Sequence, residues 1–283
     1  MQAETALLDI DWSVPAPGAV ASRFPAPSGD LALVRLGDPS RPRVVLVPGV
    51  TGSKEDFVLM SPLLVDAGFQ VVAFDMAGQY ESHAAGPRNG RRYDDDLFVD
   101  DLIAVLESDP RPTHVLGYSY AGTVVQLAWR RRPELFASLT LLSAPPVPGD
   151  AMAAISHFGW VSRVTPPALG AAFMISGLRL NYTKVPPLRQ RFVLDRLRLT
   201  RRSSVVDIVG LMKRTPDVRA ELAASALPLL VAVGEHDLWS TDLHRAAAEA
   251  LGADLRVYPT GHSPCETTPD LLVRDMLALF ERA

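Results

Sequence analysis

The chain has 283 residues, which is enough for one large domain or for a core with an inserted module. Hydrophobic residues make up 48% of the sequence, so a large buried core can form, and the formal net charge of −4 argues against a nucleic-acid-binding protein. The only cysteine, Cys265, excludes an intrachain disulfide and fits a reducing compartment.

The N-terminal stretch MQAETALLDIDWSV lacks the basic start and the apolar centre of a secretory signal peptide. No apolar run reaches the roughly 18 residues of a membrane span. The nearest, PALGAAFMISGL, is shorter and is followed by Arg179. We therefore expect a soluble, cytoplasmic protein with no stable membrane insertion.

Short apolar runs along the chain indicate a sheet. From RVVLVPG onward they are continuously apolar, as in VVAFD and LLVAVG, which is typical of parallel strands covered on both faces. The predicted strands are 19–24, 31–36, 43–48, 70–75, 113–118, 137–142, 228–233 and 255–259. We expect an α/β protein with an eight-stranded, mostly parallel sheet and helices on both faces.

Helices between these strands have recognisable ends. One begins at Ser53, with Asp56 three residues later, and a second begins near Asp94. A third follows Ser119 and ends in the arginine run 130–132, whose charge favours the negative end of a helix dipole. We interpret that run as a solvated helix terminus rather than a binding patch.

The strand–helix alternation stops between about 146 and 225, where prolines and helical patterns occur without a clear strand. The simplest account is an α/β core, 1–145 and 226–283, interrupted by a helical insertion at 146–225. The basic stretch RLRLTRR (Arg196 to Arg202) is interpreted as a solvated helix face. Recognition of a substrate carboxylate is the alternative.

Ser119 lies in HVLGYSYAGTVVQL, where an apolar run meets a helical one. A serine hydroxyl is a poor nucleophile unless it is exposed, oriented and next to a base. A sharp strand-to-helix turn provides this exposure and places the following N–H at a helix start. Such a turn needs small neighbours, here Gly117, Ala121 and Gly122, so G-x-S-x-A replaces the usual G-x-S-x-G. The alternative is a serine that caps an ordinary helix.

With this turn, further segments make the chain similar to the α/β-hydrolase family over nearly its whole length. VVLVPGVTGSKEDF is similar to the oxyanion loop after the third strand, with Pro48 where the family usually has His, and FDMAGQYES matches the turn after the fourth strand. LPLLVAVGEHDLWS resembles the strand that leads to the triad acid, here Asp237. RVYPTGHSPCETTPD resembles the loop of the triad histidine, here His262. Pro48 leaves open how the oxyanion loop is braced.

The resemblance implies a serine hydrolase with the triad Ser119, Asp237 and His262, in the order expected of this fold. His262 would take the proton from Ser119 and later give it to the leaving group, while Asp237 would fix the imidazole tautomer and stabilise its charged form. The backbone N–H groups of Val50 and Tyr120 would form the oxyanion hole.

Other polar residues compete for these roles. Glu235 and Asp242 are alternative acids, although neither lies where the family's acid does. Cys265 follows His262 without a sharp turn, and Asp75 is expected to brace the loop after its strand. No cluster has metal-ligand spacing and no phosphate loop is found, so no metal or cofactor is expected. The remaining histidines lack a context for catalysis: His83, His114, His157, His236 and His244.

In the resemblance the insertion corresponds to a cap, whose apolar side chains favour a hydrophobic acyl or ring substrate. The pocket candidates are Trp160 and Met174 from the insertion and Trp239 just past the acid. The leading hypothesis is hydrolysis of a small apolar carboxylic ester or lactone through an acyl-enzyme on Ser119. Alternatives are cleavage of a carbon–carbon bond in a vinylogous diketone acid, thioester cleavage, cofactor-free peroxidation, or a non-catalytic ligand-binding protein. The expected partner is a small-molecule substrate, and a homo-oligomer stays open.

Overall fold

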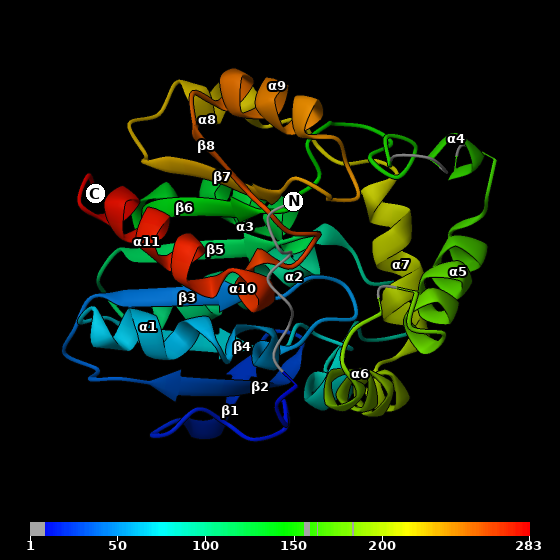
Figure 1. The fold of residues 1–283 in the computed structure, drawn as a ribbon, viewed down its shortest axis with the longest axis horizontal. Helices are drawn as coiled ribbons and strands as arrows, with labels where there is room; N and C mark the ends of the chain where they lie inside the picture. Colours follow the sequence, from blue (N-terminus) through cyan, green and yellow to red (C-terminus); the bar gives the residue numbers. More distant parts are fainter. Residues whose placement is uncertain (1–8, 156–158, 163, 183) are drawn as a thin grey trace.

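Figure 1 shows the fold as a computed structural model, which describes residues 9–155, 159–162, 164–182 and 184–283. One sheet has the strand order β1-β2-β4-β3-β5-β6-β7-β8. The pairs from β4 to β8 are parallel, whereas β1 with β2 and β2 with β4 are antiparallel. The strands are β1 (Val20–Ala26), β2 (Gly29–Leu36), β3 (Arg43–Val47), β4 (Gln70–Phe74), β5 (Thr113–Tyr118), β6 (Phe136–Leu142), β7 (Leu229–Gly234) and β8 (Asp254–Tyr258). The predicted eight-stranded, mostly parallel sheet is confirmed.

Helices cover both faces of the sheet, because its central strands are apolar on both sides and buried along their whole length. The helices α2 (Asp95–Glu107) and α3 (Ala121–Arg131) contribute to the core on one face. The helices α1 (Met60–Asp66) and α11 (Pro269–Phe280) contribute to the core on the other. The remaining elements outside residues 143–228 are η1 (Lys54–Phe57), η2 (Tyr80–Ser82), η3 (Pro133–Leu135), α9 (Thr241–Leu251) and α10 (Pro264–Thr267).

Between β6 and β7 the chain forms a helical segment, residues 143–228, in place of strands. Its helices are α4 (Gly159–Ser162), α5 (Pro167–Arg179), α6 (Pro187–Leu199), α7 (Arg202–Met212) and α8 (Arg219–Ala223). Proline stands at the start of α5 and of α6, where its missing N–H is not needed. In Figure 1, α4 to α7 lie beyond one end of the strands. Of the helices that the structure describes, none is long and apolar enough to cross a membrane.

Helix α6 is held to the core by a buried network of charged side chains. Arg189 Nη2 donates to Asp56 Oδ1 over 2.8 Å and Arg196 Nη1 to the same oxygen, while Glu266 accepts from Arg189. All four side chains are less than a tenth exposed. The interpretation of the stretch from Arg196 to Arg202 as a solvated face is therefore wrong for Arg196, because buried carboxylates compensate its charge. Within that stretch Arg198 is exposed, as expected.

Candidate active site

Ser119 occupies a sharp turn between β5 and α3. Its backbone has φ +54°, a left-handed conformation that is uncommon for a residue with a side chain. The turn is held by two backbone hydrogen bonds of 2.8 Å: the Ser119 N–H donates to the Leu142 carbonyl, and the Gly122 N–H donates to the Ser119 carbonyl. Strain of this kind persists only where the surroundings fix it.

Small residues are required around this turn at two positions. A Cβ on Gly117 would lie 2.6 Å from the Ala121 carbonyl oxygen, and one on Gly122 would lie 2.3 Å from the Ala144 Cβ. The position two residues after Ser119 instead tolerates Ala121, which is fully buried. The replacement of the usual G-x-S-x-G by G-x-S-x-A-G therefore keeps glycine where the packing is tightest.

The structure brings together Ser119, His262 and Asp237, the three residues expected to act as a triad. Ser119 Oγ lies 3.2 Å from His262 Nε2, and His262 Nδ1 contacts Asp237 Oδ1. An ionised carboxylate only accepts hydrogen bonds, so Nδ1 carries the proton and Nε2 is free to accept from the serine. The Asp237 side chain is fully buried, and that of His262 is 24% exposed. Solvent or a substrate can thus approach the histidine but not the acid.

Asp237 is kept ionised by its neighbours. Burial alone would raise the pKa of its carboxyl group. The charge of His262 and the hydrogen bonds from His244 and His262 outweigh the burial, and the pKa of Asp237 is lowered to about 2. The Leu238 N–H also donates to Asp237 Oδ1 over 2.6 Å. Asp237 therefore carries a full negative charge at neutral pH.

His244 is a site residue that the sequence patterns did not reveal. Its Nε2 lies 3.1 Å from Asp237 Oδ2, and its side chain is 1% exposed. Because the carboxylate only accepts, His244 donates, and Asp237 is held through both oxygens. A usable signal lay in the spacing: residues three, four and seven positions after His244 are apolar and buried on the same face of α9. A histidine on such a face needs a buried partner.

The backbone N–H groups of Val50 and Tyr120 are the donors expected for an oxyanion hole. Among the described residues, no hydrogen bond from the N–H of Val50 or of Tyr120 is found. Tyr120 directly follows Ser119 at the start of α3, and its side chain points away from the site, its hydroxyl donating to Asp95 over 2.8 Å. The loop of Val50 contacts the serine through Gly49, where a Cβ would lie 2.8 Å from the Ser119 Cβ. Any larger residue at 49 would therefore collide with Ser119.

The loop after β3 is braced without the histidine that Pro48 replaces. The Thr51 N–H donates to Gln79 Oε1 over 2.9 Å, and Gln79 Nε2 donates to Ser204 Oγ of α7 over 2.8 Å. Asp75 is expected to brace the turn after its own strand, and it braces both this turn and the segment that follows β3. It accepts from the Lys54 N–H over 2.8 Å and from the Glu81 N–H over 3.2 Å.

The three predicted pocket residues differ in their surroundings. Met174 of α5 packs on a small apolar cluster of Ala171, Val205 and Val209, against which Val50 also packs. Trp239 is fully buried, its ring centroid 6.1 Å from that of His262 and its Nε1 donating to the Ala151 carbonyl. Trp160 belongs to α4, but its side chain lies outside the described residues.

The competing residues lie apart from this arrangement. The alternative acids Glu235 and Asp242 are exposed. Cys265 is fully buried, and burial raises its pKa, so it is held as an unreactive thiol. His114 packs inside β5 against Phe280. The His83 ring lies against the Tyr80 carbonyl, the exposed His236 ring lies 3.4 Å from Glu235, and His157 lies outside the described residues. Over the described ranges no group of three or more His, Cys, Asp or Glu side chains could hold a metal ion.

Known proteins share both sequence pattern and fold with this chain. The sequence model described as "Alpha/beta hydrolase family" matches residues 44–275. An esterase from Exiguobacterium antarcticum superposes with a TM-score of 0.73 at 17% identity, over 93% of this chain and 100% of its own. A carboxylesterase structure from Nitrososphaera gargenis gives a TM-score of 0.74 at 18% identity, over 93% and 100%. The thioesterase domain of the curacin biosynthetic pathway gives 0.70 at 16%, over 92% and 99%. At these identities the structural likeness shows the fold alone.

Proposed function

Because the chain belongs to the alpha/beta hydrolase family, we propose that it is a serine hydrolase that cleaves a small apolar carboxylic ester or lactone through an acyl-enzyme on Ser119. The observation that carries the proposal is the hydrogen-bonded series Ser119 Oγ, His262 and Asp237, on three separate loops at one end of the sheet. Each contact has the partner and direction that nucleophilic catalysis needs.

In the proposed reaction, Ser119 Oγ attacks the ester carbonyl carbon while His262 Nε2 takes its proton. The carbonyl oxygen becomes an oxyanion, which accepts hydrogen bonds from the N–H groups of Val50 and Tyr120. Collapse breaks the bond to the alkoxide, and protonated His262 returns the proton to it. A water molecule, deprotonated by His262, then attacks the acyl-enzyme, releases the acid and restores Ser119. Asp237 stays ionised throughout and stabilises the imidazolium.

The surroundings favour a neutral, apolar substrate. Val50 and Met174 bring apolar surface to the side of the oxyanion loop that faces α5 and α7. The buried guanidinium of Arg196, a candidate for binding a substrate carboxylate, is instead engaged by Asp56 and Ser53. Arg196 is therefore not free to bind the carboxylate of a diketone acid. An acyl chain buried in such surroundings gains about 0.8 kcal/mol per CH₂.

The test is hydrolysis of p-nitrophenyl esters of graded chain length by the purified protein, with Ser119→Ala as the inactive variant. Ser143→Ala is the matched control, since Ser143 also follows a strand, has φ +45° and is buried, but among the described residues its hydroxyl has no hydrogen-bond partner. A fluorophosphonate probe should label the native protein and Ser143→Ala but not Ser119→Ala. Ester turnover or labelling that survives Ser119→Ala contradicts the proposal. If the protein cleaved thioesters or a diketone acid but no esters, the proposed substrate class of esters and lactones would be wrong and the cleaved class would take its place.

A further inference from the structure

Large apolar side chains are exposed mainly on one part of the helical segment. Of the 11 exposed large hydrophobic residues in the described chain, seven lie between Val164 and Leu199. Leu169, Phe173 and Leu180 project from one side of α5 and its C-terminal end, 48%, 64% and 67% exposed. Tyr182, which follows, is 75% exposed. An exposed apolar face of this kind marks an interaction site more often than a free surface.

The same stretch is strongly basic. Residues 164–202 contain eight arginines or lysines and one acid, Asp195, which leaves 20 basic and 31 acidic residues for the rest of the chain. Two of the eight, Arg189 and Arg196, are buried in ion pairs with the core. The other six are exposed: Arg179, Lys184, Arg191, Arg198, Arg201 and Arg202. The exposed basic residues of this stretch therefore outnumber its one acid by six to one, in a protein whose net charge is −4.

The apolar and basic side chains are adjacent in space. Arg179 of α5, Arg198 of α6 and Arg202 of α7 line one hollow of 370 Å³ together with Ala172 and Ile175. Figure 1 shows α5 on the outer side of the segment, α7 nearer to the sheet, and α6 below α7.

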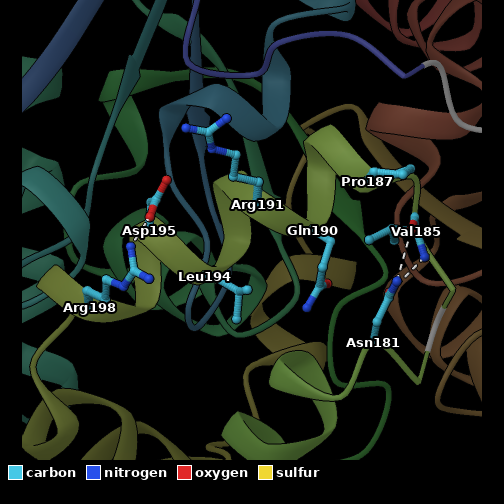
Figure 2. A pocket seen from close by; sticks show the side chains of 8 residues that line it. All are labelled: Asn181, Val185, Pro187, Gln190, Arg191, Leu194, Asp195 and Arg198. Atoms are coloured by element: carbon cyan, nitrogen blue, oxygen red, sulfur yellow. Dashed lines mark hydrogen bonds and ion pairs between the residues drawn. The ribbon is translucent and has the colours of Figure 1, made fainter.

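A second hollow of 580 Å³ opens beside α6. Figure 2 shows its lining, in which Gln190 and Leu194 extend to one side of α6 and Arg191 to the other, and Arg198 is joined to Asp195. This hollow includes none of Ser119, Asp237 or His262. It is therefore part of the outer surface rather than of the candidate active site.

The combination of exposed apolar and exposed basic side chains favours one kind of partner. A second copy docked symmetrically on this face would bring two clusters of positive charge together, which is unfavourable. A helix with an apolar face and basic flanks instead suits the interface of a bilayer with anionic headgroups. We propose that the exposed face of α5 and α6 adsorbs to anionic lipid bilayers, with Leu169, Phe173 and Leu180 at the headgroup boundary. This surface adsorption does not require a membrane-spanning helix and is independent of the proposed catalysis.

The test is cosedimentation of the full chain with vesicles of phosphatidylcholine, with and without 30% phosphatidylglycerol. We expect binding to the anionic vesicles that weakens at high salt, with little binding to pure phosphatidylcholine. Arg179→Gln/Arg198→Gln should weaken it at least about 10-fold, and Phe173→Ser/Leu180→Ser should do the same. Arg274→Gln/Arg282→Gln, on exposed arginines of the C-terminal helix region, removes the same charge and should have little effect.

Circular dichroism and melting of each variant should match the native protein, because every substituted side chain is exposed. Ser119→Ala should bind vesicles like the native protein, so failure of the catalytic proposal is distinguished from failure of this one. Equal binding to both vesicle types, or equal losses in the control variant, overturns the proposal. It is also overturned if no vesicles are bound and sedimentation shows a dimer that Phe173→Ser/Leu180→Ser dissociates, since the face would then join two copies.

Discussion

At the scale of single residues, the proposed mechanism requires Asp237 for His262 to act as a base. Asp237→Asn keeps the size of the side chain but removes the charge and allows the wrong imidazole tautomer. We expect kcat to fall by roughly 10⁴ with the fold intact. Asp242→Asn and Glu235→Gln remove carboxylates that are exposed and should change kcat little. If turnover collapsed in one of these and survived in Asp237→Asn, the acid would be assigned to the wrong residue.

His244 is expected to position Asp237 rather than to contact substrate. His244→Phe removes the donor to Asp237 Oδ2, and a hydrogen bond to a charged group contributes about 1.5–3 kcal/mol. We expect kcat to fall roughly 10- to 100-fold with KM little changed. His244→Gln can still donate from its amide and should recover much of kcat. If His244 were only structural, His244→Gln would not recover kcat relative to His244→Phe. The loss of kcat in each variant would instead follow the loss of its melting temperature.

At the scale of elements, Asp101 joins α2 to the turn between β1 and β2. Its carboxylate accepts from the N–H and Oγ of Ser28, and burial raises the pKa of Asp101 to about 6. The native state thus holds a proton that the unfolded chain releases near pH 4, so stability falls as pH rises from about 4 to 6. Asp101→Asn avoids the buried charge and can serve both Ser28 groups.

We therefore expect Asp101→Asn to raise the stability on the order of 2 kcal/mol at pH 8 and little near pH 4, measured by urea unfolding. Asp100→Asn is the control, because that neighbouring carboxylate is 50% exposed and pairs with Arg131 on the surface. A gain for Asp101→Asn that did not depend on pH would show that burial of charge is not its cause.

The helical segment should set the choice of substrate, whereas the three central residues set the rate. Met174 packs on the cluster of Ala171, Val205 and Val209, against which Val50 also packs, whereas the side chain of the adjacent Phe173 is 64% exposed. Met174→Ala should therefore move the optimum of kcat/KM with acyl chain length by one or a few carbons and spare the shortest ester. Phe173→Ala should leave the profile unchanged. A flat profile in the native protein, or an equal loss for all esters, would contradict a pocket lined by the segment.

The sequence predicts this architecture well where the pattern is local. Continuous apolar runs locate the strands, and the small residues around Ser119 locate its turn, because both depend on a few consecutive positions. The bracing of the loops is not local in this sense. Gln79 joins Thr51 to Ser204, and its partners lie 28 and 125 residues away. Arg196 belongs to a stretch typical of a solvated helix, and only the fold brings it to Asp56. Such long-range polar pairs leave no periodic signal.

At the scale of the whole molecule, the buried network of Asp56, Glu266, Arg189 and Arg196 couples the core to the helical segment. Its two positive and two negative side chains are balanced. Burial would raise the pKa of Asp56, but the charges of Arg196 and Arg189 outweigh it and lower the pKa. Asp56 is therefore ionised at neutral pH, whereas burial raises the pKa of Glu266. A network of this kind resists the removal of one member more than of a matched pair.

Asp56→Asn leaves one uncompensated positive charge in this network and should destabilise the protein by about 3–5 kcal/mol in urea unfolding. The buried charge also favours states in which α6 leaves the core, so limited proteolysis should cut first within residues 143–228. The double variant Asp56→Asn/Arg196→Met restores the balance, with Arg189 and Glu266 still paired, and should recover much of the stability. Asp195→Asn, at an exposed pair with Arg198, should cost less than about 1 kcal/mol. If the double variant were no more stable than Asp56→Asn, charge balance would not be what holds the segment to the core.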